Sequence, residues 1–388
     1  MKSSLVWAEV DLEAIAHNVR ELRRITNPVA HLMAVVKANA YGHGVVKVTR
    51  KALENGADSL GEARLEEGIE LRKAGIQQSV LIFGYTPPAL AHKLIGFDLT
   101  QTVWSHTTAQ ALSDVAVSSN KQIKVHLKVD TGMGRLGLLP DSCRFPVTDQ
   151  NLIGNAVHEA KAISSLAGLE LEGVYTHFAT ADSSDKTYAG NQFEIFVDFL
   201  NELRRAGINP PLCHAANSAA IIDMPETHLD MVRAGIAIYG LYPSDQVNKG
   251  RIDLKPAMAL KSKIVHLKKV PSGFKVSYGC IYQTPKPTII ASIPVGYADG
   301  FSRLLSSCGH MLVRGHRAPI VGRVCMDQTM LDVGHIPVVN LEDEVVIFGR
   351  QGYESITVDE IAVRLNTINY EIVSALTARV PIIYPKHS

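Results

Sequence analysis

The feature that most constrains the fold is an alternation of strand-like and helix-like segments from residue 11 to residue 240. Short apolar runs such as Val80–Phe83 are separated by longer segments with helical spacing, of which Gly190–Arg205 is the clearest. A doubly wound sheet would also alternate in this way, but no G-x-G-x-x-G motif follows the first strand. The pattern therefore predicts an α/β fold, a (β/α)8 barrel of the TIM type, with candidate strands at Leu32–Lys37, Asp58–Gly61, Val80–Phe83, Leu99–Trp104, Ile123–Val129, Leu169–Thr176, Leu212–Ala215 and Asp230–Tyr239.

The composition and the hydrophobic pattern of the sequence change after Pro243. Residues 244–255 are polar and linker-like, and from Pro256 onward short β-rich runs recur between Gly, Pro and Asp residues. We therefore predict two domains. A barrel would occupy residues 1–243, and a mostly-β C-terminal domain would occupy residues 244–388, with residues 1–10 able to pair with the second domain.

Charge and composition argue against several kinds of partner. Lys and Arg total 39 and Asp and Glu total 38, a balance that favours neither nucleic acid nor a membrane. The first residues, MKSSLVWAEV, do not resemble a secretion signal, and no run approaches the ~18 apolar residues of a membrane span. The five cysteines are widely spaced and odd in number, which predicts reduced thiols in the cytoplasm and no metal site.

Polar residues gather at the expected ends of the strands. In a barrel the carboxyl ends of all strands meet at one mouth, where the chemistry takes place. Each residue also has a structural interpretation: Lys128 and Asp130 as an ion pair, His177 and His214 as hydrogen-bonded core histidines, and the glycines as turns. The residues concerned are Lys37, Lys128, Asp130, Arg135, His177, His214, Asn217, Ser218, Arg233, Gly235 and Ile236.

Lys37 stands where an apolar strand stops, in AVVKANAYGHG. Burial lowers the pKa of an amine and makes it a nucleophile toward carbonyl groups, so Lys37 is a candidate Schiff-base lysine for an aldehyde cofactor. The alternative is a lysine that extends from the strand end into solvent. Ser218 and the N–H groups of Gly235 and Ile236 could bind a phosphate. An aldehyde and a phosphate together suggest pyridoxal 5′-phosphate (PLP).

Arg233 is the expected partner of the pyridine nitrogen of PLP, since no carboxylate is an obvious partner. An arginine only donates hydrogen bonds and would leave that nitrogen unprotonated. The ring would then be a weaker electron sink. This suits a rapid proton exchange at Cα better than transamination or β-elimination.

The sequence resembles the bacterial alanine racemases over nearly its whole length. The resemblance does not depend on one motif, because the matching stretches occur in order in both halves of the chain. It implies a PLP-binding (β/α)8 barrel followed by a β domain, in a homodimer whose active site takes residues from the partner. The stretches are AVVKANAYGHG, HLKVDTGMGRLG, GVYTHFATAD, HAANSAA, VRAGIAIYG, VSYG, VGYADG, VGRVCMDQ and TINYE.

The resemblance also implies a two-base racemisation of alanine. Lys37 would be the base on one face, and Tyr278 of the second subunit would be the base on the other. A chain from His177 through Arg233 to His214 could share the proton of Tyr278. D-Alanine made in this way would supply peptidoglycan.

The other matched positions take binding roles by the same resemblance. Arg135 would lie near the phenolic oxygen of the cofactor and the substrate carboxylate, and Lys128 corresponds to a lysine that is carbamylated in many relatives. Met326 would offer its N–H to the carboxylate, and Tyr297 would narrow the entrance. Asn217 and His177 would also contact the cofactor, and His214, Cys325 and Asp327 lie within matched motifs as supporting positions. The implied phosphate contacts are Tyr41, Ser218, Gly235, Ile236 and Tyr370.

Three alternatives stay open at this point. A broader racemase for serine, lysine or arginine differs only in pocket size. A decarboxylase of the same superfamily would require a carboxylate, in place of Arg233, as the partner of the pyridine nitrogen. A non-catalytic PLP-binding homeostasis protein would lack both the β domain and Tyr278. The connection at residues 140–159 is longer than the family would lead one to expect.

Overall fold

The computed structural model describes residues 4–140 and 156–385. These residues form two compact units. One comprises Glu13–Ala40 and Val45–Pro256, and the other comprises Met1–Leu12, Tyr41–Gly44 and Ala257–Ser388.

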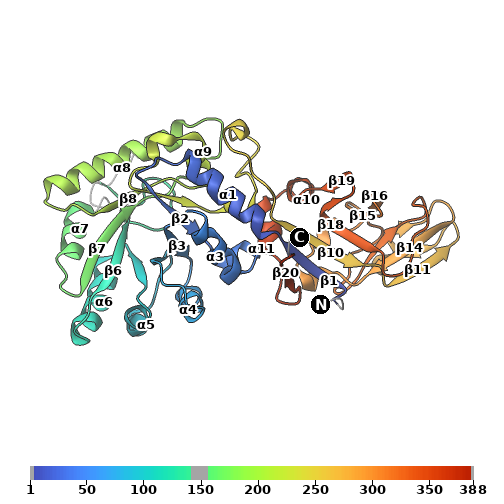
Figure 1. Ribbon diagram of the computed structural model, residues 1–388, viewed down its shortest axis with the longest axis horizontal. Helices are drawn as coiled ribbons and strands as arrows, with labels where there is room; N and C mark the ends of the chain where they lie inside the picture. Colours follow the sequence, from blue (N-terminus) through green and yellow to red (C-terminus); the bar gives the residue numbers. More distant parts are fainter. Residues whose placement is uncertain (1–3, 141–155, 386–388) are drawn as a thin grey trace. The chain divides into compact units, whose positions relative to one another are not determined.

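The first unit is a closed parallel barrel of eight strands, which confirms the predicted fold class. The barrel closes where the first strand pairs with the last, with Leu32 opposite Val232. In Figure 1 the strands lie inside a ring of helices. The strands are β2 (His31–Val35), β3 (Ser59–Glu62), β4 (Val80–Ile82), β5 (Thr100–Val103), β6 (Ile123–Lys128), β7 (Leu169–Tyr175), β8 (Leu212–His214) and β9 (Met231–Ala234).

The longer barrel helices bury an apolar face. Helix α8 is the longest, and its Phe196, Phe199 and Leu203 are fully buried because their spacing puts them on one side. Within the barrel, Met33, Leu81 and Met231 form an apolar cluster. The helices are α1 (Leu12–Ile25), α2 (Lys37–Tyr41), α3 (Val45–Glu54), α4 (Leu65–Lys73), α5 (Ala91–Gly96), α6 (His106–Ser118), α7 (Ala156–Ser164), α8 (Thr187–Arg205) and α9 (Ser218–Asp223).

Two of the predicted strands end more than one residue earlier in the structure. Strand β2 ends at Val35, so Lys37 opens the short helix α2 instead of ending the strand. The strand expected over Asp230–Tyr239 ends at Ala234, because Gly235 leaves the extended region and a 3-10 turn, η4 (Ile236–Tyr239), follows. Both places are where the backbone leaves the barrel wall at its mouth.

The second unit is mostly β, as predicted. Its main sheet has the order β16-β15-β18-β10-β1-β20, with β19 paired to β18, and a smaller sheet has the order β11-β14-β17. The strands are β1 (Val6–Val10), β10 (Met258–Lys263), β11 (His266–Val270), β12 (Lys275–Val276), β13 (Tyr282–Gln283), β14 (Thr288–Ile293), β15 (His310–Val313), β16 (His316–Pro319), β17 (Thr329–Asp332), β18 (Glu344–Gln351), β19 (Glu354–Ile356) and β20 (Ile382–Ile383).

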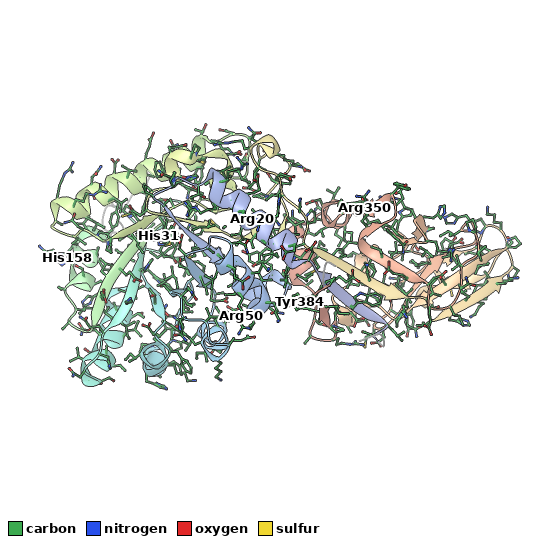
Figure 2. The ribbon with its side chains drawn as sticks, viewed as in Figure 1. Arg20, His31, Arg50, His158, Arg350 and Tyr384 are labelled. Carbon is green, nitrogen blue, oxygen red and sulfur yellow. The ribbon has the colours of Figure 1, made fainter. Side chains whose placement is uncertain are left out.

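The N-terminal strand and a pair of helices complete this unit. Strand β1 pairs antiparallel with β10 and parallel with β20. Helix α10 (Val358–Leu365) begins after Thr357, whose hydroxyl caps the N–H of Glu360, and α11 (Asn369–Ser374) follows. Tyr384, labelled in Figure 2, donates its hydroxyl to the carbonyl of His43, 3.1 Å away. Gly44 lies beside it at φ +90°, where a Cβ would meet that hydroxyl.

No helix in residues 4–140 and 156–385 is long and apolar enough to cross a membrane. Of the five cysteines, Cys143 lies outside the described residues, as does most of the long connection at residues 140–159. The other four, Cys213, Cys280, Cys308 and Cys325, are free thiols.

Candidate active site

Lys37 opens a strained turn at the mouth of the barrel. Ala38, Asn39 and Ala40 all take left-handed helical angles, with φ between 53° and 55°. For L-residues this conformation costs about 1–2 kcal/mol each, so it persists only where other contacts impose it. The turn directs the chain sharply away from β2 directly after the lysine.

Glu67 and Asn39 hold this turn in place. One carboxylate oxygen of Glu67 accepts the N–H of Ala38 at 2.7 Å, and the other accepts the N–H groups of Ala63 and Arg64. The side chain of Asn39 accepts the N–H of Val45 at 2.9 Å. Glu67 was not expected as a site residue. Its place in the first turn of α4 could have suggested only a helix cap.

The amine of Lys37 is partly buried among charged groups. Burial is the main cause that lowers its pKa, and the nearby positive charge of Arg135 lowers it further. Glu62, at the end of β3, is fully buried, and neither carboxyl oxygen has a hydrogen-bond partner among the described residues. Burial therefore raises the pKa of Glu62 to about 9. Lys37 is thus more easily deprotonated than a surface lysine.

Arg233 is a buried cation fixed by four hydrogen bonds. One terminal nitrogen donates to Nδ1 of His214 at 2.8 Å. The other donates to the carbonyls of Thr176 and Ala215, both at 2.8 Å, and to Nδ1 of His177 at 3.2 Å. Burial lowers its pKa to about 10, so it stays charged at neutral pH. Among the described residues its Nε–H has no protein acceptor, so this donor is available to a ligand.

The two histidines bound to Arg233 are held neutral. Burial, together with the charge of Arg233, lowers the pKa of both His177 and His214 well below the usual value. His214 also stacks on Tyr175, with ring centroids 4.7 Å apart and an interplanar angle of 8°. We call Arg233, His177 and His214 the Arg233 network.

Lys128 and Arg135 lie on the strand and loop next to this network. Nζ of Lys128 is buried, lies 4.5 Å above the ring of Tyr175 and has no hydrogen-bond partner among the described residues. Burial and the charges of Arg233 and Arg135 lower its pKa well below the usual value. The interpretation of Lys128 and Asp130 as a simple ion pair is wrong. Asp130 instead accepts the N–H groups of the loop that leads to Arg135, including that of Arg135 at 2.9 Å.

The loops after β8 and β9 meet at Ser218. Its hydroxyl accepts the N–H of Gly235 at 2.8 Å, so this N–H is already occupied. Asn217 caps α9 by accepting the N–H of Ala220 at 3.0 Å. Within the described residues, the N–H groups of Ser218, Ala219 and Ile236 have no protein acceptor. This loop pair therefore presents unused donors of the kind that bind a phosphate.

In the second unit, four predicted residues come together on its surface. Ser277, directly before Tyr278, contacts the thiol of Cys325 at 3.4 Å, and the N–H of Tyr297 donates to the carbonyl of Cys325 at 3.1 Å. Tyr278, Tyr297 and Met326 are exposed to 70%, 42% and 52%. We call Tyr278, Tyr297, Cys325 and Met326 the Tyr278 patch.

The remaining predicted residues of this unit lie in ordinary contacts. Asp327 pairs with Arg379 at 2.7 Å on the surface. The rings of Tyr41 and Tyr370 lie 6.1 Å apart at a tilted angle, and Tyr41 is buried. No group of three metal-ligating side chains occurs within residues 4–140 and 156–385.

The comparisons with known proteins cover both units. Residues 10–243 match the family model "Alanine racemase, N-terminal domain", and residues 257–384 match "Alanine racemase, C-terminal domain". The chain is 54% identical to an alanine racemase of Desulfosudis oleivorans, over 99% of this chain and 97% of that one. It is 52% identical to an alanine racemase of Methanococcus maripaludis, over 99% of this chain and 100% of that one.

A solved structure agrees with these sequence relatives. An alanine racemase of Clostridium difficile 630 matches with a TM-score of 0.92 and 39% identity. The match covers 99% of this chain and 97% of that chain.

Proposed function

This chain belongs to the alanine racemase family, and we propose that it is a PLP-dependent enzyme that interconverts L-alanine and D-alanine. The observation that carries the proposal is Arg233, a buried cation that is held by four hydrogen bonds and whose Nε–H is unused among the described residues. An arginine can only donate hydrogen bonds, so it leaves the pyridine nitrogen of PLP unprotonated and the ring a weaker electron sink. This suits a reaction in which a proton is removed from Cα and quickly returned. A decarboxylase is disfavoured by the same residue.

The residues at the barrel mouth fit PLP. Lys37 has the lowered pKa that an amine needs to react with an aldehyde. The unused N–H groups of Ala219 and Ile236 suit a phosphate, and the Nε–H of Arg233 suits a pyridine nitrogen. When bound, PLP draws electron density away from Cα of the substrate and makes its proton acidic.

We assign the two proton transfers to Lys37 and Tyr278. One base must take the proton from Cα, and a second must stand on the opposite face to return one. Lys37 is supported by its lowered pKa. Tyr278 is 70% exposed on its own unit, which supports a role in the site of a second copy of the chain. The proposed assembly is therefore a homodimer that shares its active sites.

We assign substrate positioning to Arg135, Lys128 and Met326. Arg135 would hold the carboxylate of alanine, since the loop that carries it is fixed by Asp130. A carbamate would replace the buried amine of Lys128, which has no hydrogen-bond partner among the described residues, with a negatively charged group that attracts Arg135. Met326 would add its N–H and Tyr297 would narrow the entrance, both from the second copy.

Racemisation measured over a panel of L- and D-amino acids tests this proposal. We expect alanine to give the highest kcat/KM and the other side chains to be weaker. A methylene or a hydroxyl is worth only ~1–3 kcal/mol in an apolar pocket, so serine should show measurable turnover. Faster turnover of lysine or arginine would indicate a broad racemase. PLP binding without turnover of any amino acid would overturn the enzymatic proposal.

A further inference from the structure

A continuous line of polar side chains crosses the barrel below the Arg233 network. His214 is bonded to Arg233 through Nδ1, and its Nε2 lies 2.9 Å from Nδ1 of His126 on β6. Nε2 of His126 in turn lies 3.4 Å from a carboxylate oxygen of Glu172 on β7. His126 and His214 are fully or almost fully buried. His126 opens the matched stretch HLKVDTGMGRLG but received no role there, and Glu172 lies outside the matched stretches.

The hydrogens along this line follow from Arg233, which can only donate. Nδ1 of His214 must therefore be an unprotonated acceptor, and a neutral His214 carries its proton on Nε2. That proton points to Nδ1 of His126, so His126 carries its own proton on Nε2, toward Glu172. His214 thus donates to His126, the Nε2–H of His126 faces a carboxylate oxygen 3.4 Å away, and the line ends on an anion.

Two local features of strands β6 and β7 make room for the imidazole ring of His126. The register between β6 and β7 shifts between Val125 and His126. Opposite His126 stands Gly173, where an added Cβ would lie 2.7 Å from the imidazole ring. Any larger residue would force that ring to move, so the small residue and the irregular register together make room for the histidine.

Glu172 lies at the end of the barrel opposite the mouth. Its carboxylate accepts the hydroxyl of Thr100, the first residue of β5, at 3.2 Å. Lys124, near the start of β6, lies 3.4 Å away. The hydrogen bond with His126 is the main cause that lowers the pKa of Glu172, to about 2, so the group is an anion at neutral pH.

We propose that Glu172 is a positioning residue for Arg233. Through His126 and His214 it fixes the orientation of the guanidinium from the far end of the barrel, and it supplies the negative charge that this buried cation otherwise lacks. Among the described residues, Arg233 has two carbonyl and two imidazole partners but no carboxylate partner. The inference rests on the proposed function only in taking Arg233 as the partner of the pyridine nitrogen.

The test is Glu172→Gln in the full-length protein, with and without PLP. In the wild type, 15N NMR of the imidazoles should find His126 and His214 each with the proton on Nε2. Because Arg233 still donates to Nδ1 of His214, both histidines should keep the proton on Nε2 in the variant. The Nε2–H signal of His126 should instead move upfield, and that of His214 should follow by less, because the charged acceptor at the end of the line is gone. We expect kcat for alanine to fall by roughly tenfold with little change in KM, because a charge-assisted contact in a buried network is lost.

Two further variants make the result decisive. His126→Gln interrupts the line one step closer to Arg233 and should shift the Nε2–H signal of His214 and lower kcat, even if Glu172→Gln does not fold. Lys124→Gln removes the surface partner of Glu172 but keeps its carboxylate, and it should leave both Nε2–H signals and kcat unchanged. An unchanged His214 Nε2–H signal and an unchanged kcat in Glu172→Gln and His126→Gln would overturn the inference. Altered Nε2–H signals in a protein that racemises no amino acid would support it and reject the proposed function instead.

Discussion

The Arg233 network and the Tyr278 patch differ in solvent exposure and in how their side chains are held. Arg233 and His214 are buried, and each is held by hydrogen bonds from within the barrel. Tyr278, Tyr297 and Met326 are exposed by between 42% and 70%, although the backbone that carries them is tied together through Cys325. One region is complete in itself, and the other presents ordered side chains to the solvent.

This difference indicates which groups the chain can organise alone. Charged groups that bind a cofactor gain from a buried and rigid surrounding, because they then need no rearrangement during the reaction. A large aromatic side chain on a well-ordered surface is more typical of an interface. The contrast supports a site whose cofactor half is built by the barrel and whose second base comes from another copy.

The substitution with the largest expected effect on activity is Lys37→Ala, at the mouth of the barrel. The variant should lose the visible absorbance of bound PLP and at least ~10³-fold in activity, because it lacks both the amine for the aldehyde and one base. Absorbance spectra and racemisation rates provide the check, with the exposed Lys121→Ala as the matched control. Full PLP absorbance in Lys37→Ala would place the cofactor elsewhere.

Tyr278→Phe tests the role of the exposed Tyr278 patch. We expect a loss of ~10²–10⁴ in racemisation, the usual contribution of a positioned acid or base, and a change in stability within about 0.5 kcal/mol. Exchange of the Cα proton with solvent deuterium should be impaired far more for one enantiomer of alanine than for the other. Equal and small losses would argue against two bases. Tyr353→Phe, at a fully exposed tyrosine, is the control.

Glu62→Gln tests how strongly burial in the barrel perturbs a charged group, through the pH dependence of the free energy of unfolding. The folded-state pKa of Glu62 is about 9 and the unfolded value is near 4.5, so between these pH values only the folded state keeps the proton. Wild-type stability should therefore fall as pH rises through this range, by about 1.4 kcal/mol per unit. Glu62→Gln removes this dependence and should be more stable by roughly 3 kcal/mol at pH 7.

Urea unfolding at pH 5, 7 and 8 provides the measurement, with the exposed Glu66→Gln as the control. The advantage of Glu62→Gln should be small at pH 5 and should grow with pH. A difference between variant and wild type that is the same at all three pH values would mean that Glu62 is ionised in the folded protein.

The regular elements of the fold could be predicted from the sequence. Helix α8 contains the predicted segment Gly190–Arg205 and shows a clear apolar face, and β4 matches the predicted strand Val80–Phe83 to within one residue. Such elements are predictable because apolar period and turn residues are local properties of the sequence. The alternation of strands with helices was sufficient to predict the barrel.

The irregular backbone of the site could not be predicted in this way. Ala38 and Asn39 carry no residue preference strong enough to signal a left-handed run, which Glu67 imposes from a distant part of the sequence. Gly235 was expected inside a strand because the apolar run continues through it. His126 looked like one more residue of an alternating strand, since its partners come from β7 and β8. Tertiary contacts decide all three positions.

The most direct test of the shared site is to mix Lys37→Ala with Tyr278→Phe after each has been purified in an inactive form. A mixed dimer would contain one site with both native bases. Random exchange of subunits should therefore restore about a quarter of wild-type activity, since half of the dimers are mixed and each has one working site. No recovery, in a sample where native mass spectrometry finds mixed dimers, would contradict a site built from Lys37 of one copy and Tyr278 of the other.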